Sequence, residues 1–475
     1  MAKLTSREEA LRVQLISLGQ DHIWEHCMLL EGGERANFLD MLNVLDFDSL
    51  KKAIQMSLGA HACEEDVSLL EPPSYIASPQ AGGDVHAWEA ARTLGESLLS
   101  SGKVAALTVA GGQGTRLGLS GPKGCFGVTP VCQKSLFQVF AEKILAAQRR
   151  YKNRFYWLMM TSQVNNEQTT QFFHDNDFFG LEEEQVIFFE QGLLPSIDCE
   201  GKLILEALGR LALSPDGHGG TFDALLKSGS LDRLKVDGVE ILSYFQVDNP
   251  LVQVLDPVFI GFHQKHGSSM SSKMVVKEDP HEKVGLFCQQ EGVLGIAEYS
   301  DIPKSLAEER DATGQLTLRA GNIAVHLIDC DFASHIAGQH ALPFHCAKKA
   351  IPFLDDNGKT VRPEAPNGIK FEKFVFDGLQ FAENPLILEA IRGEEFSPVK
   401  NAKGADSPET SMRDQSLVFA GWLNAAGVDV PRDAEGDLLY RLEVSSLFAD
   451  DQDTFLMRWD QLDPKPNLHA DLYLE

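Results

Sequence analysis

The sequence predicts an α/β protein with a mainly parallel central sheet, a helical N-terminal region and a small C-terminal domain. Apolar runs of strand length recur beyond Lys103, at 103–109, 154–160, 185–189 and 239–245. Longer amphipathic stretches separate these runs, and this alternation is typical of a parallel sheet that helices cover on both faces. A chain of 475 residues is also too long for a single ordinary core.

The pattern divides the chain into three expected domains. They are a helical N-terminal region, a central domain with the strands, and a small C-terminal domain, at 1–95, 96–402 and 403–475. Near the start, Thr5 and Ser6 each precede a glutamate by three positions, which is the capping-box pattern of a helix N-terminus. The stretch 71–84 is rich in Pro, Ser and Gly and predicts a linker.

The central domain begins with the strand 103–109, which leads directly into a glycine-rich loop. Ligands of parallel α/β folds lie at the C-terminal ends of the strands, so this loop is at a candidate site. The next stretch, 135–150, carries apolar residues at helical spacing and predicts a helix. From 403 onward the chain becomes polar and acidic, which indicates the small C-terminal domain.

The composition disfavours several classes of protein. A formal charge of −27 opposes non-specific binding to nucleic acid, and no apolar run reaches the roughly 20 residues that span a membrane. The N-terminus lacks a secretory-type apolar stretch. The eight cysteines are scattered, without a CxxC pair, and are interpreted as reduced thiols. We therefore expect a cytoplasmic monomer or weak homo-oligomer with neither a nucleic-acid nor a membrane partner.

The glycine-rich loop is LTVAGGQGTRLGLSGPKG, residues 107–124. Glycine after a strand lets backbone N–H groups approach a phosphate. The Walker A pattern is absent, since Gly124 and not Ser or Thr follows Lys123. The dinucleotide pattern GxGxxG also fails, because Leu117 stands where its third glycine belongs. The pattern fits a third type, the nucleotidyltransferase loop; a tight turn without a ligand is the structural alternative.

The loop and the blocks after it resemble the eukaryotic-type UDP-N-acetylglucosamine pyrophosphorylases, within the wider UDP-sugar pyrophosphorylase family. The blocks follow in the family's order and include FFEQGLLPSIDCEGKLILE, SPDGHGGTFDAL, QVDNPLVQVLDPVFIGF, VGLFCQQEG, IAEYSDI, RAGNIAVH, PNGIKFEKFVFD and EEFSPVKNAKG. They cover about residues 100–405. Ordered blocks of this length are far more specific than a single glycine motif.

The resemblance implies a Rossmann-like nucleotidyltransferase core that makes a UDP-sugar and pyrophosphate from UTP and a sugar 1-phosphate. The sugar phosphate is already largely a dianion near neutral pH, since a phosphate's second pKa is about 6. Its oxygen therefore needs no general base to attack the α-phosphorus, and alignment and charge neutralisation remain. The implied cofactor is Mg²⁺, which prefers carboxylate and phosphate oxygens.

The resemblance also implies roles for individual residues. The expected catalytic cations are Arg116, Lys123 and Lys400; the nucleotide-binding residues are Gly111, Gly112, Gln191, Gly217 and Asp248; the sugar-binding residues are His218, Gly285, Glu298, Tyr299, Asn322 and Phe376; and the Mg²⁺ ligand is Asp248. Taken alone, each has a structural alternative. The run from Asp248 to Pro250, for example, could simply be a turn.

One position departs from the N-acetylglucosamine branch. The branch usually has GNGG, whereas this chain has GHGG with His218, which resembles the glucose-type and broad-range enzymes. The sugar therefore stays open among the N-acetylglucosamine, N-acetylgalactosamine, glucose and galactose 1-phosphates. His218 could also contact only the ribose, the uracil or solvent. Two other functions compete, a nicotinamide-dependent oxidoreductase and a non-catalytic nucleotide sensor, but the failed GxGxxG and the retained cations argue against them.

Overall fold

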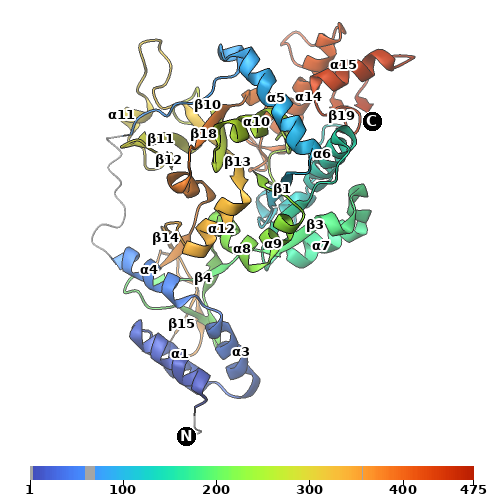
Figure 1. The fold of residues 1–475 in the computed structure, drawn as a ribbon. Helices are drawn as coiled ribbons and strands as arrows, with labels where there is room; N and C mark the ends of the chain where they lie inside the picture. The colour runs from blue at the N-terminus through green and yellow to red at the C-terminus, as the bar shows by residue number, and fades with distance from the viewer. Residues whose placement is uncertain (1–3, 59–69, 356) are drawn as a thin grey trace. The chain divides into compact units, whose positions relative to one another are not determined.

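The computed structural model describes residues 4–58, 70–355 and 357–475 (Figure 1). Their contacts divide the chain into two compact units. Unit 1 comprises the described residues of Met1–Asp66, Gln191–Asp223 and Gly338–Asp377, and unit 2 those of Val67–Glu190, Ala224–Ala337 and Gly378–Glu475. The three predicted domains stay a prediction, because this division follows contacts and not independent folding.

Unit 2 is built on the predicted parallel strands. In the order β3-β2-β1-β9, each strand is parallel to its neighbour. Their bounds are Val186–Glu190, Trp157–Thr161, Val104–Val109 and Ile241–Gln246. All four predicted strands are confirmed, with starts one to three residues later than expected. β1 is buried along nearly its whole length, as a central strand covered on both faces should be.

Antiparallel strands extend this sheet beyond β9, which the sequence pattern did not predict. β13 (Ala320–Asp329) pairs with β9, and also with β10 and β11. The outer strands are β10 (Met270–Val276), β11 (Leu286–Gln290), β12 (Val293–Ala297) and β18 (Leu386–Glu389). A sheet of nine strands results, with β3, β2, β1 and β9 parallel at one side and mostly antiparallel pairs at the other, where β18 alone of the added strands is parallel to its neighbour, β10.

Helices pack against this sheet (Figure 1). The predicted helix at 135–150 is α6, Leu136–Tyr151. Ser135 caps its N-terminus, because the Ser135 hydroxyl accepts the N–H of Gln138. Its apolar face lies in the main core of unit 2 with Phe137, Phe140 and Ile144. The other α-helices with residues in this unit before the C-terminal region are α5 (Val85–Ser100), α7 (Asn166–Asp175), α8 (Thr221–Lys227), α9 (Ser230–Val236), α10 (Pro257–His266), α11 (Lys304–Ala307), α12 (Cys330–Gln339) and α13 (Arg392–Glu395).

The C-terminal region belongs to unit 2 and has a core of its own. It consists of α14 (Pro408–Ala425), β19 (Leu442–Val444), α15 (Gln452–Gln461) and β20 (Leu472–Leu474). Phe455 and Trp459 of α15 are buried in that core. Gln415 of α14 donates to the backbone oxygen of Val128, so the region is attached to the rest of the unit.

The predicted linker 71–84 has no long helix or strand, but the sheet holds it. The N–H of Glu71 bonds to the Gln289 oxygen at 2.9 Å, and the N–H of Ile76 bonds to the Ile387 oxygen at 2.9 Å. Prolines prevent a regular strand here, because they lack the N–H that a ladder requires.

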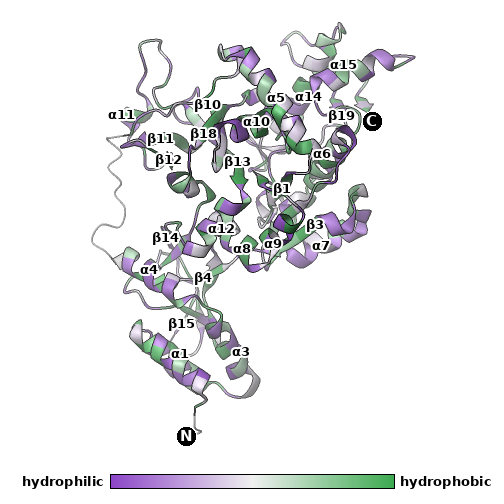
Figure 2. Ribbon diagram, in the orientation of Figure 1, coloured by the Kyte–Doolittle hydropathy of each residue, from purple (hydrophilic) through white to green (hydrophobic). Residues whose placement is uncertain are grey.

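Unit 1 begins with four helices, α1 (Ser6–Ser17), α2 (Asp21–Leu29), α3 (Gly32–Asn43) and α4 (Phe47–Leu58). The predicted capping box at the start of α1 is formed by Thr5 and Glu8. α1 carries both apolar and charged residues (Figure 2), and its Leu11 and Leu15 are buried. Residues 59–69 of the predicted helical region, and with them Cys63, lie outside the described residues.

The remainder of unit 1 consists of short strands. They are β4 (Leu193–Pro195), β5 (Ile197–Asp198), β6 (Leu205–Ala207), β7 (Arg210–Leu211), β8 (Leu213–Pro215), β14 (His345–Lys349), β15 (Phe353–Leu354), β16 (Thr360–Val361) and β17 (Gly368–Glu372). β17 lies between β14 and β5, and its Ile369 and Phe371 join the leucines of the helices in one core. No helix in the described parts of either unit is long and apolar enough to cross a membrane.

Candidate active site

The glycine loop follows β1 and closes on itself. The N–H of Gly114 bonds to the Gly121 oxygen at 2.8 Å, and the N–H of Lys123 bonds to the Gly112 oxygen at 3.1 Å. A Cβ on Gly112 would meet no atom within 4 Å, so the backbone there borders open space. Bare backbone at Gly112 leaves room for a phosphate, and the role of Gly111 and Gly112 in binding one stays a prediction.

The last glycine of the PKG motif has a packing role. A Cβ on Gly124 would lie 2.1 Å from the Phe137 ring of α6, closer than real contacts allow. Gly124 therefore lets the loop press against the helix, which places Lys123 at the edge of the sheet.

Asn165, a residue that the sequence pattern did not single out, holds the loop. Asn165 is fully buried after β2, and its side chain donates to the Ala110 oxygen at 2.9 Å and to the Gly112 oxygen at 3.4 Å. Its own oxygen accepts the N–H of Ser162 at 2.8 Å. A polar run directly after a buried strand, TSQVNN at 161–166, was the available signal.

Lys123 and Asp248 form the centre of the candidate site in unit 2. Lys123 Nζ lies 3.2 Å from Asp248 Oδ2, and Asp248 is only 8 % exposed. β1 and β9 are adjacent and parallel, with Val109 opposite Gln246. The glycine loop and Asp248 therefore leave the same edge of the sheet, where ligands of such folds bind.

Asn249, beside Asp248, does more than form a turn. Its amide donates to the Glu395 backbone oxygen at 2.7 Å and accepts the N–H of Ser397 at 3.1 Å. The N–H of Val399 bonds to the Asp248 backbone oxygen at 2.8 Å. The segment that leads to Lys400 is thus attached to the segment that carries Asp248. Asn249 and Ser397, which form one of these bonds, lie 148 residues apart in the chain.

The other two predicted cations are less constrained. The Lys400 side chain is 41 % exposed, with Asp406 at 3.9 Å and the Phe396 ring beside it. Arg116 is exposed and forms no ion pair with any residue that the structure describes. Both side chains can therefore reorient toward an anionic ligand.

Asp248 fits a magnesium ion that arrives with phosphates. No group of three metal-binding side chains occurs among the described residues. Mg²⁺ is usually held by one or two carboxylates together with substrate phosphates, and it keeps several waters. A single buried carboxylate beside the glycine loop is compatible with that mode of binding, and a metal site made of protein ligands alone is not supported.

Three of the predicted sugar-binding residues come together in unit 2. The N–H of Asn322 on β13 bonds to the Gly285 oxygen at 2.8 Å. A Cβ on Gly285 would lie 3.6 Å from a carboxylate oxygen of Glu298, so that side chain lies next to the glycine. Tyr299 follows at the end of the β11-β12 hairpin and is exposed. Strand pairing in the antiparallel part of the sheet therefore brings these residues together.

Two of the predicted nucleotide-binding residues, Gln191 and Gly217, lie in unit 1. Gln191 is buried directly after β3, and Gly217 opens the short helical turn 218–220 with φ +83°. Asp216, which the sequence analysis missed, contacts this segment closely, because a Cβ on Gly192 or Gly220 would meet its carboxylate at 2.3 or 2.2 Å. Lys373, also missed, is buried and pairs with Asp223 at 2.8 Å.

His218 belongs to an aromatic cluster in unit 1. Its ring stacks on Phe374 at 5.2 Å between centroids and lies 5.6 Å from Phe376, and its Nδ1 accepts the N–H of Val375 at 3.1 Å. Desolvation, and then the nearby His345, lower the pKa of His218 to about 4. The ring is therefore neutral near pH 7, and it supports the segment that carries Phe376, itself a predicted sugar contact.

The chain is similar to a known family and to named proteins of several organisms. The family model described as UTP–glucose-1-phosphate uridylyltransferase matches residues 78–416. The chain is 37 % identical over 438 residues to UDP-N-acetylhexosamine pyrophosphorylase-like protein 1 of Xenopus tropicalis, with 88 % of this chain and 85 % of that protein covered. It is also 37 % identical over 441 residues to UDP-N-acetylglucosamine pyrophosphorylase of Saccharomyces cerevisiae, covering 87 % and 91 %.

Solved structures agree with these relatives. The uridine diphosphate N-acetylglucosamine pyrophosphorylase of Trypanosoma brucei, solved with an inhibitor, matches with a TM-score of 0.84 and 29 % identity, over 100 % of this chain and 99 % of that one. A mutant of UDP-glucose pyrophosphorylase from Leishmania major matches with a TM-score of 0.60 and 15 % identity, over 96 % and 87 %. The second likeness concerns the fold alone.

Proposed function

Because the chain belongs to the UTP–glucose-1-phosphate uridylyltransferase family, we propose that it makes UDP-N-acetylglucosamine and pyrophosphate from UTP and N-acetylglucosamine 1-phosphate. The protein is a UTP:sugar-1-phosphate uridylyltransferase of the α/β type, and UTP and a sugar 1-phosphate are its substrates. The choice of the N-acetylated sugar is supported by the names of relatives that are 34–38 % identical. The observation that carries the chemistry is the pairing of Lys123 with Asp248 beside the glycine loop.

The proposed reaction is a direct in-line displacement. An oxygen of the sugar phosphate forms a bond to the α-phosphorus of UTP, and the bond from that phosphorus to the oxygen bridging to the β-phosphate breaks. The electron pair leaves with pyrophosphate, so no covalent enzyme intermediate is needed. The chain has to align the two substrates and offset the charge that grows on the leaving group.

Charge stabilisation is the proposed task of the loop and the three cations. Backbone N–H groups near Gly111 and Gly112, with the guanidinium of Arg116, donate to phosphate oxygens. Lys123 and Lys400 supply point charges. Lys123 is held by Asp248 in the free protein, so we propose that it exchanges the carboxylate for a phosphate oxygen when UTP binds.

Mg²⁺ is part of the proposal, with Asp248 as its protein ligand. When bound, the ion would neutralise phosphate charge and orient the triphosphate. The support is the buried carboxylate at the loop edge and the preference of Mg²⁺ for carboxylate and phosphate oxygens.

Glu298, Asn322 and Gly285 are proposed to line the sugar site, since their contacts place them together. UDP-glucose or UDP-galactose synthesis is the second candidate, which His218 in GHGG favours. A cytoplasmic location and a monomeric or weakly associated state stay predictions.

The test is to incubate the full chain with UTP, Mg²⁺ and one sugar 1-phosphate at a time, and to measure pyrophosphate. The sugars are N-acetylglucosamine, N-acetylgalactosamine, glucose and galactose 1-phosphates, with reactions lacking the sugar as controls. We expect the highest kcat/KM with N-acetylglucosamine 1-phosphate. Preference for glucose or galactose 1-phosphate would establish the second candidate, and UTP binding without pyrophosphate release from any sugar would contradict both.

A further inference from the structure

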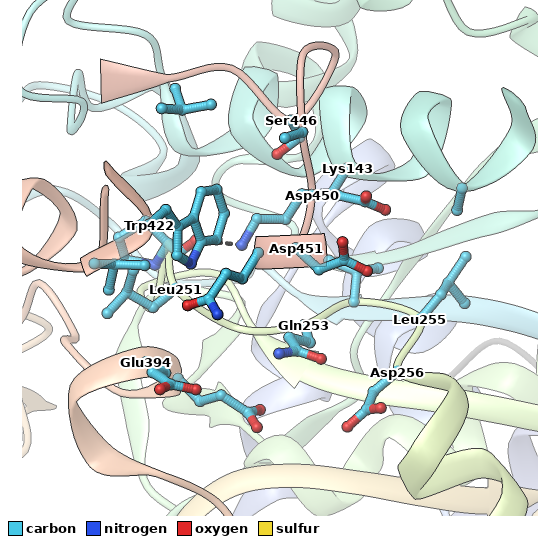
Figure 3. Close-up of a pocket in the computed structure, with 18 of the residues that line it drawn as sticks. Lys143, Leu251, Gln253, Leu255, Asp256, Glu394, Trp422, Ser446, Asp450 and Asp451 are labelled. Atoms are coloured by element: carbon cyan, nitrogen blue, oxygen red, sulfur yellow. Dashed lines mark hydrogen bonds between the residues drawn. The ribbon is translucent and has the colours of Figure 1, made fainter. Parts of the chain in front are cut away.

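Unit 2 contains a cavity of about 430 Å³ at the junction of the parallel sheet and the C-terminal region (Figure 3). Its labelled side chains come from α6, the segment after β9, α13, α14 and the segment before α15. Pockets of roughly 300–1,000 Å³ are the usual size for small-molecule ligands. None of the residues proposed above for UTP or sugar lines this cavity.

The lining of the cavity is strongly acidic. Nine lining residues are Asp or Glu, and four are Lys or Arg. Two of the basic residues are already engaged, since Lys134 binds Glu142 at 2.7 Å and Arg150 binds Asp451 at 2.7 Å. A surplus of negative charge in a partly enclosed space favours a cationic ligand.

One carboxylate in the lining has a buried oxygen without a hydrogen-bond partner among the described residues. Glu443 is only 2 % exposed, and its Oε2 accepts the N–H groups of Val131 and Cys132 at 2.7 and 2.8 Å. Its Oε1 is buried and makes no hydrogen bond with any residue that the structure describes. A buried charged oxygen without a partner is costly, and a cationic N–H donor in the cavity would satisfy it.

Aromatic rings complete the lining. Trp422 and Phe419 pack edge to face at 5.3 Å, and Trp88 also borders the cavity. Aromatic faces attract organic ammonium groups and pack against their carbon chains. A metal ion has little use for such a surface, and the described residues contain no group of three that could hold one.

We propose that this cavity binds a small organic polycation, such as an aliphatic polyamine, and that its occupation lowers the turnover of the enzyme. The ammonium groups would bind Glu443 and the neighbouring carboxylates, and the aliphatic chain would pack on Trp422 and Phe419. No covalent step is involved.

The cavity wall is connected to the candidate active site. Lys143 lines it and donates to the backbone oxygens of Pro250 and Val252 at 2.6 and 2.7 Å, directly after Asp248 and Asn249. Glu395, also in the lining, is attached by its backbone oxygen to Asn249.

A buried lysine fixes the charge of this wall. Lys273 is 1 % exposed and pairs with both Glu395 and Asp256, the latter at 2.6 Å. A cation in the cavity would compete with Lys273 for these carboxylates. The segment from Glu395 to Lys400, and with it the backbone contact between Val399 and Asp248, would then shift.

The binding test uses the full chain and spermidine as the probe, in isothermal titration calorimetry. The neutral molecule 1,8-octanediol and Mg²⁺ serve as ligand controls, because a protein of charge −27 attracts any cation weakly. Glu443→Gln keeps the shape and the acceptor for the two N–H groups but removes the charge. Glu309→Gln is the matched control, since Glu309 is exposed and does not line the cavity. Ser446→Trp fills the cavity from its edge.

We expect saturable binding of spermidine with one molecule per chain, and no binding of the diol. Glu443→Gln should weaken the affinity about tenfold, as loss of one charge-assisted hydrogen bond does, whereas Glu309→Gln should leave it unchanged. Ser446→Trp should abolish binding while circular dichroism shows the native fold. Equal affinity for spermidine in all three variants would overturn the proposed site. Equal affinities for Mg²⁺ and spermidine at the same ionic strength would overturn it as well.

The kinetic part rests on the proposed uridylyl transfer, whereas the binding part does not. Pyrophosphate release is measured at saturating substrates with rising spermidine. We expect kcat to fall several-fold in the wild type and to stay constant in Ser446→Trp, which also controls for spermidine bound to UTP. Binding by calorimetry with an unchanged kcat would overturn the coupling alone. A wild type that releases no pyrophosphate at all would contradict the proposed function. The proposed binding site would then still be judged by the calorimetric titration alone.

Discussion

Asp248 makes two separate contacts, since its buried carboxylate pairs with Lys123 and its backbone oxygen accepts the N–H of Val399 in the segment that leads to Lys400. We predict that Asp248→Asn lowers kcat at least about 100-fold, since loss of a preorganised electrostatic contact typically costs about 2.7–4 kcal/mol. The change is nearly isosteric, so the thermal unfolding midpoint should move little. Pyrophosphate release with and without Mg²⁺ measures the effect.

Asp331→Asn is the matched control, because Asp331 is an exposed aspartate of α12. It should behave as the wild type does. Full activity of the wild type in excess chelator would show that the reaction does not require Mg²⁺. Full activity of Asp248→Asn would show that Asp248 is not the metal ligand that the reaction needs.

Arg116 and Lys123 share the loop but differ in their surroundings, since Lys123 pairs with Asp248 in the free protein and Arg116 has no ion-pair partner among the described residues. We predict that alanine at either position lowers kcat far more than it raises KM for the sugar phosphate, by about 2–4 kcal/mol of transition-state stabilisation. Arg362→Ala, which removes another exposed arginine, is the control. A wild-type kcat in both loop variants would show that the loop only fills space.

His218 contacts the rings of Phe374 and Phe376, and we propose that it acts on sugar selectivity through Phe376. We predict that His218→Asn shifts preference toward N-acetylglucosamine 1-phosphate by roughly 10- to 200-fold at most, the range of a single pocket contact. The measurement is kcat/KM for the glucose and N-acetylglucosamine 1-phosphates in both proteins. An unchanged ratio would exclude His218 from sugar selectivity.

His218 should also make the stability of the protein depend on pH. Burial lowers the pKa of His218 to about 4 in the folded protein, from an ordinary 6.5. Between these values the unfolded chain binds the proton more readily, so the wild type loses stability as pH falls from 6.5 toward 4, by up to about 1.4 kcal/mol per pH unit. His218→Asn has no such proton to bind. Denaturant unfolding of both proteins across this range should give curves that diverge on acidification, and parallel curves would contradict the shift.

Among the elements, α5 and α10 cross at unusually close range. A Cβ on Gly95 would lie 1.8 Å from the Pro257 oxygen, and one on Gly261 would lie 1.8 Å from the Ala91 oxygen. Each helix therefore presents a glycine to the backbone of the other, and no Cβ fits at these two positions. This crossing holds α10, which packs against the sheet, and α10 in turn begins at Pro257, which lines the cavity together with the capping residue Asp256.

We predict that Gly95→Ala destabilises the protein by at least the roughly 1–3 kcal/mol typical of overpacking, because the two backbones must separate. The control is Gly421→Ala in α14, where a Cβ meets nothing within 4 Å. That change should stabilise by up to about 1 kcal/mol, since alanine favours helix. Chemical denaturation measures both, and an unchanged stability of Gly95→Ala would show that the crossing is looser than described.

Across the protein as a whole, the charge of −27 is the dominant property. Like charges repel within the compact state, and salt screens them with a Debye length of about 8 Å at 0.15 M. We predict that the thermal unfolding midpoint rises when sodium chloride increases from about 0.01 to about 0.15 M, because the Debye length falls from about 30 to about 8 Å over this range. Thermal unfolding by circular dichroism measures it, and a falling midpoint would show that attractive ion pairs outweigh the net repulsion.

Local sequence patterns were enough to find individual elements. Apolar runs and helical spacing predicted β1, β2, β3, β9 and α6, because periodicity reports which face of an element is buried. The glycine loop and Asp248 were placed at strand ends for the same reason. The ordered blocks predicted the family, which the similarity to known proteins confirms. The site roles themselves stay predictions.

The meeting of distant segments, in contrast, followed from the packing of the folded chain. The fold pairs Lys123 with Asp248, 125 residues apart, attaches Val399 behind Asp248, and sets β13 antiparallel to β9. It also leaves Glu443 with an oxygen that has no partner among the described residues, in an acidic cavity. Local periodicity carries no information about which partner an element will find. A buried carboxylate and an exposed one look alike in sequence until the fold removes the water from one of them.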